Sequence, residues 1–170
     1  MKRNSKTKIK VPKLLANQSS FSSWILKDLN DTIRFGRNLI QKRPNIKLLL
    51  LQGDLGAGKT SLVKGIAKEI DISEPITSPT FALAQHYPTG KRHLVHIDLY
   101  RLEDSKTANE LFFEEEETIP KDGLLIIEWP ERLNINLQEA WLAKLEYTND
   151  DKRIIQLFPP ESERKCFTFS

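Results

Sequence analysis

The chain has 170 residues, of which 39% are hydrophobic and 29% are charged. This length and composition predict one globular domain with a sizeable buried core. No segment approaches the roughly 18 to 20 apolar residues of a membrane span, and a single cysteine excludes an intramolecular disulfide and a cysteine-rich metal site. We therefore expect a cytoplasmic protein that does not contact membranes.

The net charge of +3 belongs to the start of the chain. Residues 1–27 hold seven Lys and Arg and no acidic residue, whereas the remainder holds 19 basic and 23 acidic residues. We predict a basic, disordered tail over 1–20, one folded domain over 21–160 and a C-terminal tail over 161–170. A solvated role is favoured for the basic tail, with nucleic-acid contact or organelle targeting as alternatives.

The first predicted elements are an edge strand and an amphipathic helix. Residues 19–27, SSFSSWILK, have strand-like content. Asn30 and Asp31 are plausible caps for a helix over 31–42, which Pro44 ends. The side chains that could share its inward face are Ile33, Leu39 and Ile40.

A buried strand, a glycine-rich loop and a second helix come next. Residues 48–52, LLLLQ, are a continuous apolar run, typical of a strand covered on both faces. Residues 53–60, GDLGAGKT, match the pattern G-x-x-x-x-G-K-[ST], and 61–70 show helical spacing. A phosphate-binding loop leaves a strand, wraps a polyphosphate with backbone N–H groups and enters a helix whose positive end faces the anion. This context predicts a site for a nucleoside triphosphate.

Two side chains of this loop are expected to work directly on the nucleotide. Lys59 should reach the β- and γ-phosphates and is also a predicted catalytic residue, while the Thr60 hydroxyl should bind Mg²⁺. Backbone amides should supply most of the other anion contacts. The loop residues predicted to bind the nucleotide are Asp54, Gly56, Ala57, Gly58, Lys59, Thr60 and Ser61.

The rest of the chain alternates short strands with one helix. The predicted segments are a turn and strand over 76–87, a hairpin loop over 88–92, a strand over 93–102, a helix over 108–117 that ends before Pro120, a strand over 124–128, and a hairpin of strands 141–147 and 153–158. This pattern predicts an α/β fold with a P-loop NTPase-type core. Its mixed sheet should be parallel in the centre and antiparallel at the edges, with flanking helices.

Two acidic residues follow apolar strands. Asp98 ends LVHID, and Glu128 ends LLIIE. A carboxylate at the end of a core strand beside the phosphate loop is where the second acidic element of these NTPases lies. Either residue alone is compatible with a surface charge. Their joint presence suggests that one carboxylate orients the metal and the other positions or activates the attacking water.

Four motifs in a fixed order resemble one family. They are GDLGAGKT (53–60), TSPTF (77–81), HIDLYR (96–101) and IEWPER (127–132). Together they resemble the bacterial TsaE (YjeE) family, the small ATPases of tRNA threonylcarbamoyladenosine synthesis, over roughly residues 30–157. The resemblance implies an ATP-binding, Mg²⁺-dependent, slow ATPase that works with a TsaB–TsaD-like heterodimer. That partner modifies adenosine 37 of tRNAs reading codons that begin with adenine, so this chain would meet tRNA only indirectly.

The resemblance also implies roles for particular residues. Glu128 matches the family's strand-end acid next to tryptophan and is assigned to Mg²⁺, while Asp98 is assigned to catalysis; the two roles stay exchangeable at this point. Thr80 resembles a switch residue able to contact the metal or the γ-phosphate. The alternative is a structural hydroxyl at the start of a strand that forms its hydrogen bonds locally. Trp129 is assigned to the nucleotide site, with a buried structural tryptophan as the alternative.

Three further features have open interpretations. His96 shares a strand face with Asp98 and either supports the site or is structural. Tyr100 and Arg101 are candidates for partner contact, phosphate stabilisation or an internal ion pair, with a place near the site favoured for Arg101. The acidic run 114–117 stands where family members commonly carry a glycine-containing, leucine-rich turn. It is interpreted as a solvated face or a partner-docking surface.

Other functional classes fit the sequence less well. A small-molecule P-loop kinase is the main alternative, but it would need an acceptor pocket and usually an arginine-rich lid. The arginines after the loop are unclustered: Arg92, Arg101, Arg132, Arg153 and Arg164. A GTPase switch would need an N-K-x-D motif, which the chain lacks. A non-catalytic, nucleotide-gated binding module is the remaining class.

Overall fold

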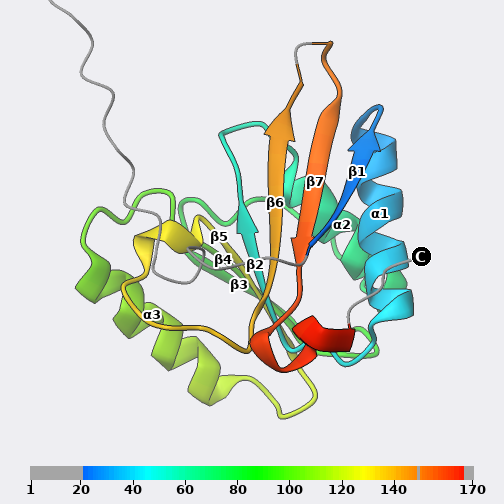
Figure 1. Cartoon of the computed structure of the whole chain (residues 1–170). Coiled ribbons are helices and arrows are strands. Elements are labelled where there is room, and N and C mark those ends of the chain that lie inside the picture. The colour runs from blue at the N-terminus through cyan, green and yellow to red at the C-terminus, as the bar shows by residue number, and fades with distance from the viewer. Residues whose placement is uncertain (1–20, 149, 167–170) are drawn as a thin grey trace, which may run out of the picture.

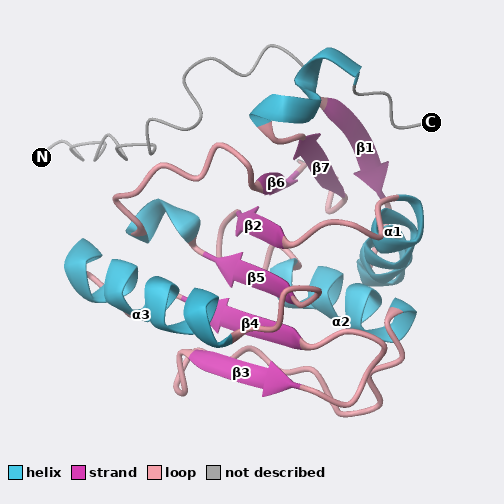
Figure 2. Ribbon diagram, turned by 90° about the horizontal axis from the view of Figure 1, so that it is seen from below, coloured by secondary structure: helices cyan, strands magenta, loops and turns pink. Residues whose placement is uncertain are grey.

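The computed structural model describes residues 21–148 and 150–166, which form a seven-stranded sheet with helices on both faces (Figures 1 and 2). The predicted basic tail 1–20 lies outside the described residues, so the division into tails and domain stays a prediction. In chain order, the elements are β1 (Ser22–Leu26), α1 (Leu29–Lys42), β2 (Leu48–Gln52), α2 (Lys59–Glu69), β3 (Ala84–Tyr87), β4 (Leu94–Asp98), α3 (Ser105–Thr118), β5 (Leu124–Glu128), the 3₁₀ turn η2 (Pro130–Arg132), β6 (Trp141–Tyr147), β7 (Arg153–Phe158) and the 3₁₀ turn η3 (Glu161–Cys166).

The sheet is mixed, with the strand order β1-β7-β6-β2-β5-β4-β3. Strand β2 runs parallel to β5 and β6, and β4 runs parallel to β5. The pairs β1–β7, β6–β7 and β3–β4 are antiparallel. The predicted α/β fold with a parallel centre and antiparallel edge strands is therefore confirmed. Because β2, β4 and β5 run the same way, the segments that follow them meet at one edge of the sheet.

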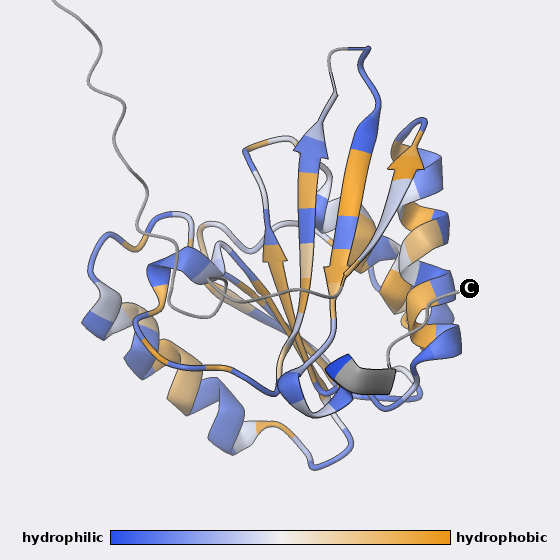
Figure 3. Cartoon of the chain, in the orientation of Figure 1, coloured by the Kyte–Doolittle hydropathy of each residue, from blue (hydrophilic) through white to orange (hydrophobic). Residues whose placement is uncertain are grey.

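The helices divide the core into two layers. Helices α1 and α2 cover one face of the sheet, and α3 covers the other (Figure 2). Along β2, Leu49 and Leu51 pack into the layer under α1 and α2, whereas Leu50 packs into the layer with Phe112 of α3. The central strands are accordingly the most continuously hydrophobic segments (Figure 3). Burial on both faces explains why LLLLQ shows no polar alternation.

Helix α1 starts two residues before its predicted start, and its predicted caps are wrong. Asp28 is the N-cap, and its carboxylate accepts a hydrogen bond from the Asp31 amide at 2.8 Å. Asn30 and Asp31 already lie in the first turn. On the inward face, Ile33 is only half-buried and Phe35 is buried instead. The other two predicted inward residues are buried as expected.

Two glycines allow α1 and α2 to pack unusually close together. A Cβ on Gly65 of α2 would overlap the backbone carbonyl of Ile33, and one on Gly36 of α1 would overlap the carbonyl of Leu62. Side chains cannot relieve these overlaps because the facing atoms are backbone. The packing of α1 therefore sets the position of α2, the helix that begins in the glycine-rich loop.

The remaining elements agree with the sequence except at their ends. The strand predicted over 93–102 stops at Asp98, where the Tyr100 amide turns back to donate to the Asp98 carboxylate at 3.0 Å. Helix α3 begins at Ser105, three residues early, because Asp104 caps it by accepting from the Thr107 amide at 3.0 Å. Among the described helices, none combines the length and apolar content needed to cross a bilayer.

Candidate functional site

The glycine-rich loop between β2 and α2 has the backbone of an anion-binding turn. Gly53, Gly56 and Gly58 have φ angles of 149°, 81° and 106°, which L side chains rarely adopt. Gly58 is the N-cap of α2 and provides no side chain to cap the helix. The backbone N–H groups of the first helical turn are therefore available to donate hydrogen bonds to a ligand. These amides and the positive end of the helix dipole favour a bound anion.

A cavity of about 380 Å³ opens beside this loop. Nine predicted site residues line it: Gly56, Gly58, Lys59, Thr60, Ser61, Thr80, Asp98, Glu128 and Trp129. Two predicted nucleotide-binding residues do not. The side chain of Asp54 is exposed, and its carbonyl accepts the Ala57 amide at 3.1 Å; Ala57 itself is fully buried in the core.

Lys59 is buried at the start of α2, with an exposed fraction of 4%. Its Nζ donates to the carbonyls of Gly53 at 2.7 Å and Asp54 at 3.0 Å, and it lies 4.3 Å from the centre of the Trp129 ring. Burial lowers the pKa of Lys59, although the charge of Glu128 acts in the opposite direction. An anion in the cavity would therefore be attracted to a cation that the protein has partly removed from water.

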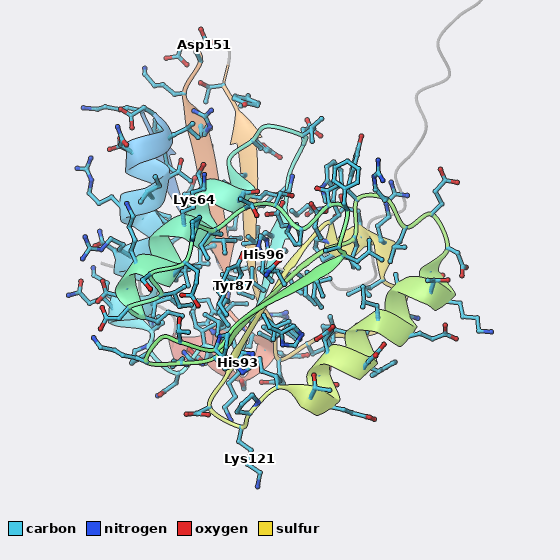
Figure 4. The ribbon with its side chains drawn as sticks, turned by 180° about the vertical axis from the view of Figure 1, so that it is seen from behind. Lys64, Tyr87, His93, His96, Lys121 and Asp151 are labelled. Carbon is cyan, nitrogen blue, oxygen red and sulfur yellow. The ribbon has the colours of Figure 1, made fainter. Side chains whose placement is uncertain are left out.

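Thr60, Glu128 and His96 form a chain of contacts from α2 to the sheet interior. The Thr60 hydroxyl donates to Glu128 Oε1 at 2.9 Å, and His96 Nε2 lies 2.9 Å from the same oxygen. His96 is fully buried inside the sheet (Figure 4), and its Nδ1 has no partner among the described residues. A hydroxyl beside a carboxylate is a donor set that suits Mg²⁺, which needs few protein ligands. The residues present thus fit the expected metal.

Asp98 lies beside Glu128 in the register of β4 and β5. The hydroxyls of Ser78 and Thr80 each donate to Asp98 Oδ2 at 2.6 Å, and the Tyr100 amide donates to Oδ1 at 3.0 Å. The two strand-end acids therefore meet at the edge of the sheet that carries the phosphate loop. Thr80 contacts Asp98, so its predicted contact with the metal or γ-phosphate stays a prediction.

Of the aromatic and cationic residues predicted near the site, Trp129 and Tyr100 line the cavity, whereas Arg101 does not. Trp129 lines it in the left-handed conformation, with φ 61°, and its ring centre lies 4.9 Å from that of Tyr100. Trp129 is half-buried and also packs against the core layer that contains Phe112, so its assignment to the nucleotide site stays a prediction. Arg101 does not line the cavity; its guanidinium carbon lies 4.2 Å from the ring centre of Phe81, which is 83% exposed.

The acidic run of α3 is only partly a free charged face. Glu115 lies 2.7 Å from His86 Nε2 of β3 and is half-buried, whereas Glu114, Glu116 and Glu117 are exposed. The run lies away from the cavity, none of whose lining residues belongs to α3. Partner docking by this face stays a prediction.

Sequence reasoning missed several residues of the site. Ser78 belongs to the quoted TSPTF motif. Its position two residues before the candidate Thr80 was the sequence feature that could have identified it as a site residue. Leu29 and Leu55 line the mouth of the cavity as exposed apolar side chains. Backbone carbonyls of the same loop also accept hydrogen bonds from Tyr147 and Arg153, which no local motif marks.

The strand–glycine loop–helix unit, set in a mixed sheet with two strand-end acids beside it, defines an α/β protein with a P-loop NTPase-type core. A family model described as "Threonylcarbamoyl adenosine biosynthesis protein TsaE" matches residues 26–155. The chain belongs to the TsaE family. The resemblance drawn from the four sequence motifs is thereby confirmed.

Individual relatives agree with this assignment. The chain is 43% identical over 120 residues to a protein of Synechocystis sp. (strain ATCC 27184 / PCC 6803 / Kazusa), covering 69% of this chain and 74% of the relative. It is 39% identical over 137 residues to one of Nostoc sp. (strain PCC 7120 / SAG 25.82 / UTEX 2576), covering 79% and 83%. Both are named tRNA threonylcarbamoyladenosine biosynthesis protein TsaE. The crystal structure of Bacillus subtilis YdiB is similar with a TM-score of 0.66 and 25% identity, covering 86% of this chain and 90% of that one.

Proposed function

We propose that this chain is a slow, Mg²⁺-dependent ATPase that supports threonylcarbamoylation of adenosine 37 in tRNAs reading codons that begin with adenine. It would act in the cytoplasm with a TsaB–TsaD-like heterodimer and meet tRNA only through that complex. Membership of the TsaE family supports the pathway. The observation that carries the ATPase proposal is the meeting of Thr60, Glu128 and Asp98 at one cavity beside the glycine-rich loop.

Phosphate binding is assigned to the loop and the start of α2. The amides that follow Gly58 lack partners further back in the helix, so they would donate to phosphate oxygens. Lys59 would exchange its two backbone carbonyl contacts for phosphate oxygens, which are stronger acceptors because they are charged. Trp129 and Tyr100 would shield this end of the cavity from water.

Metal binding is assigned to Thr60 and Glu128. Their oxygens already lie 2.9 Å apart, and His96 holds the Glu128 carboxylate from inside the sheet. Mg²⁺ bound there would neutralise charge on the β- and γ-phosphates. The direct contact between Thr60 and Glu128 is the reason to prefer Glu128 over Asp98 for the metal, since Thr60 belongs to the phosphate loop.

Asp98 is assigned to the attacking water. Three donors from Ser78, Thr80 and Tyr100 fix its carboxylate at the cavity wall. In hydrolysis, the water oxygen bonds to the γ-phosphorus, the bond from that phosphorus to the bridging oxygen breaks, and the water loses a proton. Asp98 would orient this water and accept its proton.

The test compares ATP binding and ATP turnover in the isolated chain and with a TsaB–TsaD heterodimer. Lys59→Ala should severely weaken ATP binding. Asp98→Asn should retain ATP and lose hydrolysis, whereas Glu128→Gln should chiefly impair Mg²⁺-dependent binding. The opposite pattern for the two acids would exchange their roles. Phosphate transfer from ATP to an added metabolite by the isolated chain would favour the kinase alternative and contradict the proposal.

A further inference from the structure

The phosphate loop contacts the β6–β7 hairpin, which projects past the rest of the sheet and has Asp151 near its tip (Figures 1 and 4). Tyr147 and Arg153 lie opposite each other in the register of this hairpin. The Tyr147 hydroxyl donates to the Gly56 carbonyl, and Arg153 Nε donates to the Ala57 carbonyl at 3.2 Å. Neither side chain is among the residues that line the cavity.

The two side chains also contact each other. Arg153 Nη2 lies 3.4 Å from the Tyr147 hydroxyl, and the guanidinium carbon lies 4.9 Å from the centre of the Tyr147 ring. They cover the loop closely, because a Cβ on Gly56 would lie 3.2 Å from the Tyr147 hydroxyl and one on Gly58 would lie 3.5 Å from Arg153 Nε. The pair therefore contacts the loop as one unit.

Holding these carbonyls also orients the amides of the same peptide groups. A trans peptide group is planar, so its C=O and N–H point in opposite directions. Because Arg153 holds the Ala57 carbonyl, the Gly58 N–H of the same peptide group points away from Arg153; among the described residues it has no acceptor. The next peptide group back is held at both ends, since Tyr147 binds the Gly56 carbonyl and the Ala57 amide donates to Asp54.

We propose that Tyr147 and Arg153 are positioning residues that fix the phosphate-binding shape of the loop, an inference that rests on the proposed ATP site. Three glycines with positive φ give this loop more conformational freedom than an ordinary segment. A loop that must be ordered at the moment of binding loses affinity, whereas a preorganised loop does not. The hairpin thus supplies order that the glycine sequence cannot supply by itself.

The experiment measures the Kd of the full chain for MgATP and for inorganic tripolyphosphate by titration calorimetry. Tyr147→Phe keeps the ring and removes only the hydroxyl, and Arg153→Ala removes the guanidinium. Each should raise both Kd values by about tenfold, the effect of one hydrogen bond of about 1.4 kcal/mol. The loss should be equal for the two ligands because the affected contacts go to phosphate. Arg153→Lys, which can still donate to the Ala57 carbonyl, should recover part of the affinity.

Two controls separate this proposal from the proposed function and from a general loss of structure. Lys152→Ala removes a charge on the same hairpin that pairs with Asp150 at 2.5 Å, and it should leave both Kd values unchanged. Hydrogen exchange at residues 56–58 should rise in the Tyr147 and Arg153 variants. Normal affinity in those variants would overturn the positioning role and leave the ATP site standing. A wild-type chain that binds neither ligand would overturn both.

Discussion

Replacing Gly65 by alanine tests whether the close packing of α1 on α2 limits stability. Two effects of opposite sign compete. Alanine in place of glycine in a helix interior stabilises it by about 1 kcal/mol. The new methyl group, however, would overlap the Ile33 carbonyl oxygen and lie 2.8 Å from the Ile33 carbonyl carbon and 3.1 Å from its Cα. All three are backbone atoms, so the helices themselves must move apart.

The magnitude of the overlap decides which effect wins. Overpacking of a well-packed core costs about 1 to 3 kcal/mol, and rigid backbone partners place Gly65→Ala at the upper end. After subtraction of the helix propensity, we expect a net loss of about 2 kcal/mol, which lowers Tm by about 4 to 8 °C in a chain of this size. Thermal unfolding followed by circular dichroism measures it. The matched control is Lys64→Ala, on the exposed face of the same helix (Figure 4). An unchanged or raised Tm in Gly65→Ala would refute the packing argument.

Three further predictions concern the site and the surface. His96→Phe should weaken Mg²⁺-dependent ATP binding by about tenfold, because Glu128 loses its buried partner, while His96→Gln, which keeps a donor, should lose less; calorimetry with and without Mg²⁺ measures both. Burial raises the pKa of Glu131. Its protonated form is therefore favoured by folding, and the free energy of unfolding of wild type relative to Glu131→Gln should fall as the pH rises above about 4.5; a constant difference would contradict this. Charge reversal at Glu116–Glu117 should weaken heterodimer binding if α3 docks the partner, and unchanged affinity in a pull-down titration would reject docking.

The meeting of the two acids could be predicted because it depends on rules that the sequence displays. Asp98 and Glu128 each end an apolar strand, and parallel strands align their carboxyl ends. The helix cap could not be predicted in the same way. Asp28, Asn30 and Asp31 are all suitable cap residues within four positions, and only the direction of the Asp28 side chain selects it.

The contact of the hairpin with the phosphate loop could not be predicted from the sequence, for a different reason. The pattern of 141–158 predicts two paired strands, but it does not say which third strand they join. The structure places β6 directly beside β2, which brings Tyr147 and Arg153 to a loop about 90 residues earlier in the chain. Contacts of this kind arise from strand order, and strand order depends on the whole sheet rather than on any local pattern.

The two acids have different kinds of structural support, which would separate the two steps proposed for them. Glu128 is held from inside the sheet by His96, a fully buried side chain. Asp98 is held by Ser78 and Thr80 from a surface segment that also carries Phe81, one of the most exposed hydrophobic residues described. Changes in this surface segment should therefore affect Asp98, proposed to orient the water, before they affect Glu128, proposed to bind the metal. Under the proposed function, hydrolysis would then vary while ATP and Mg²⁺ stay bound, as an ATPase whose turnover serves a partner requires.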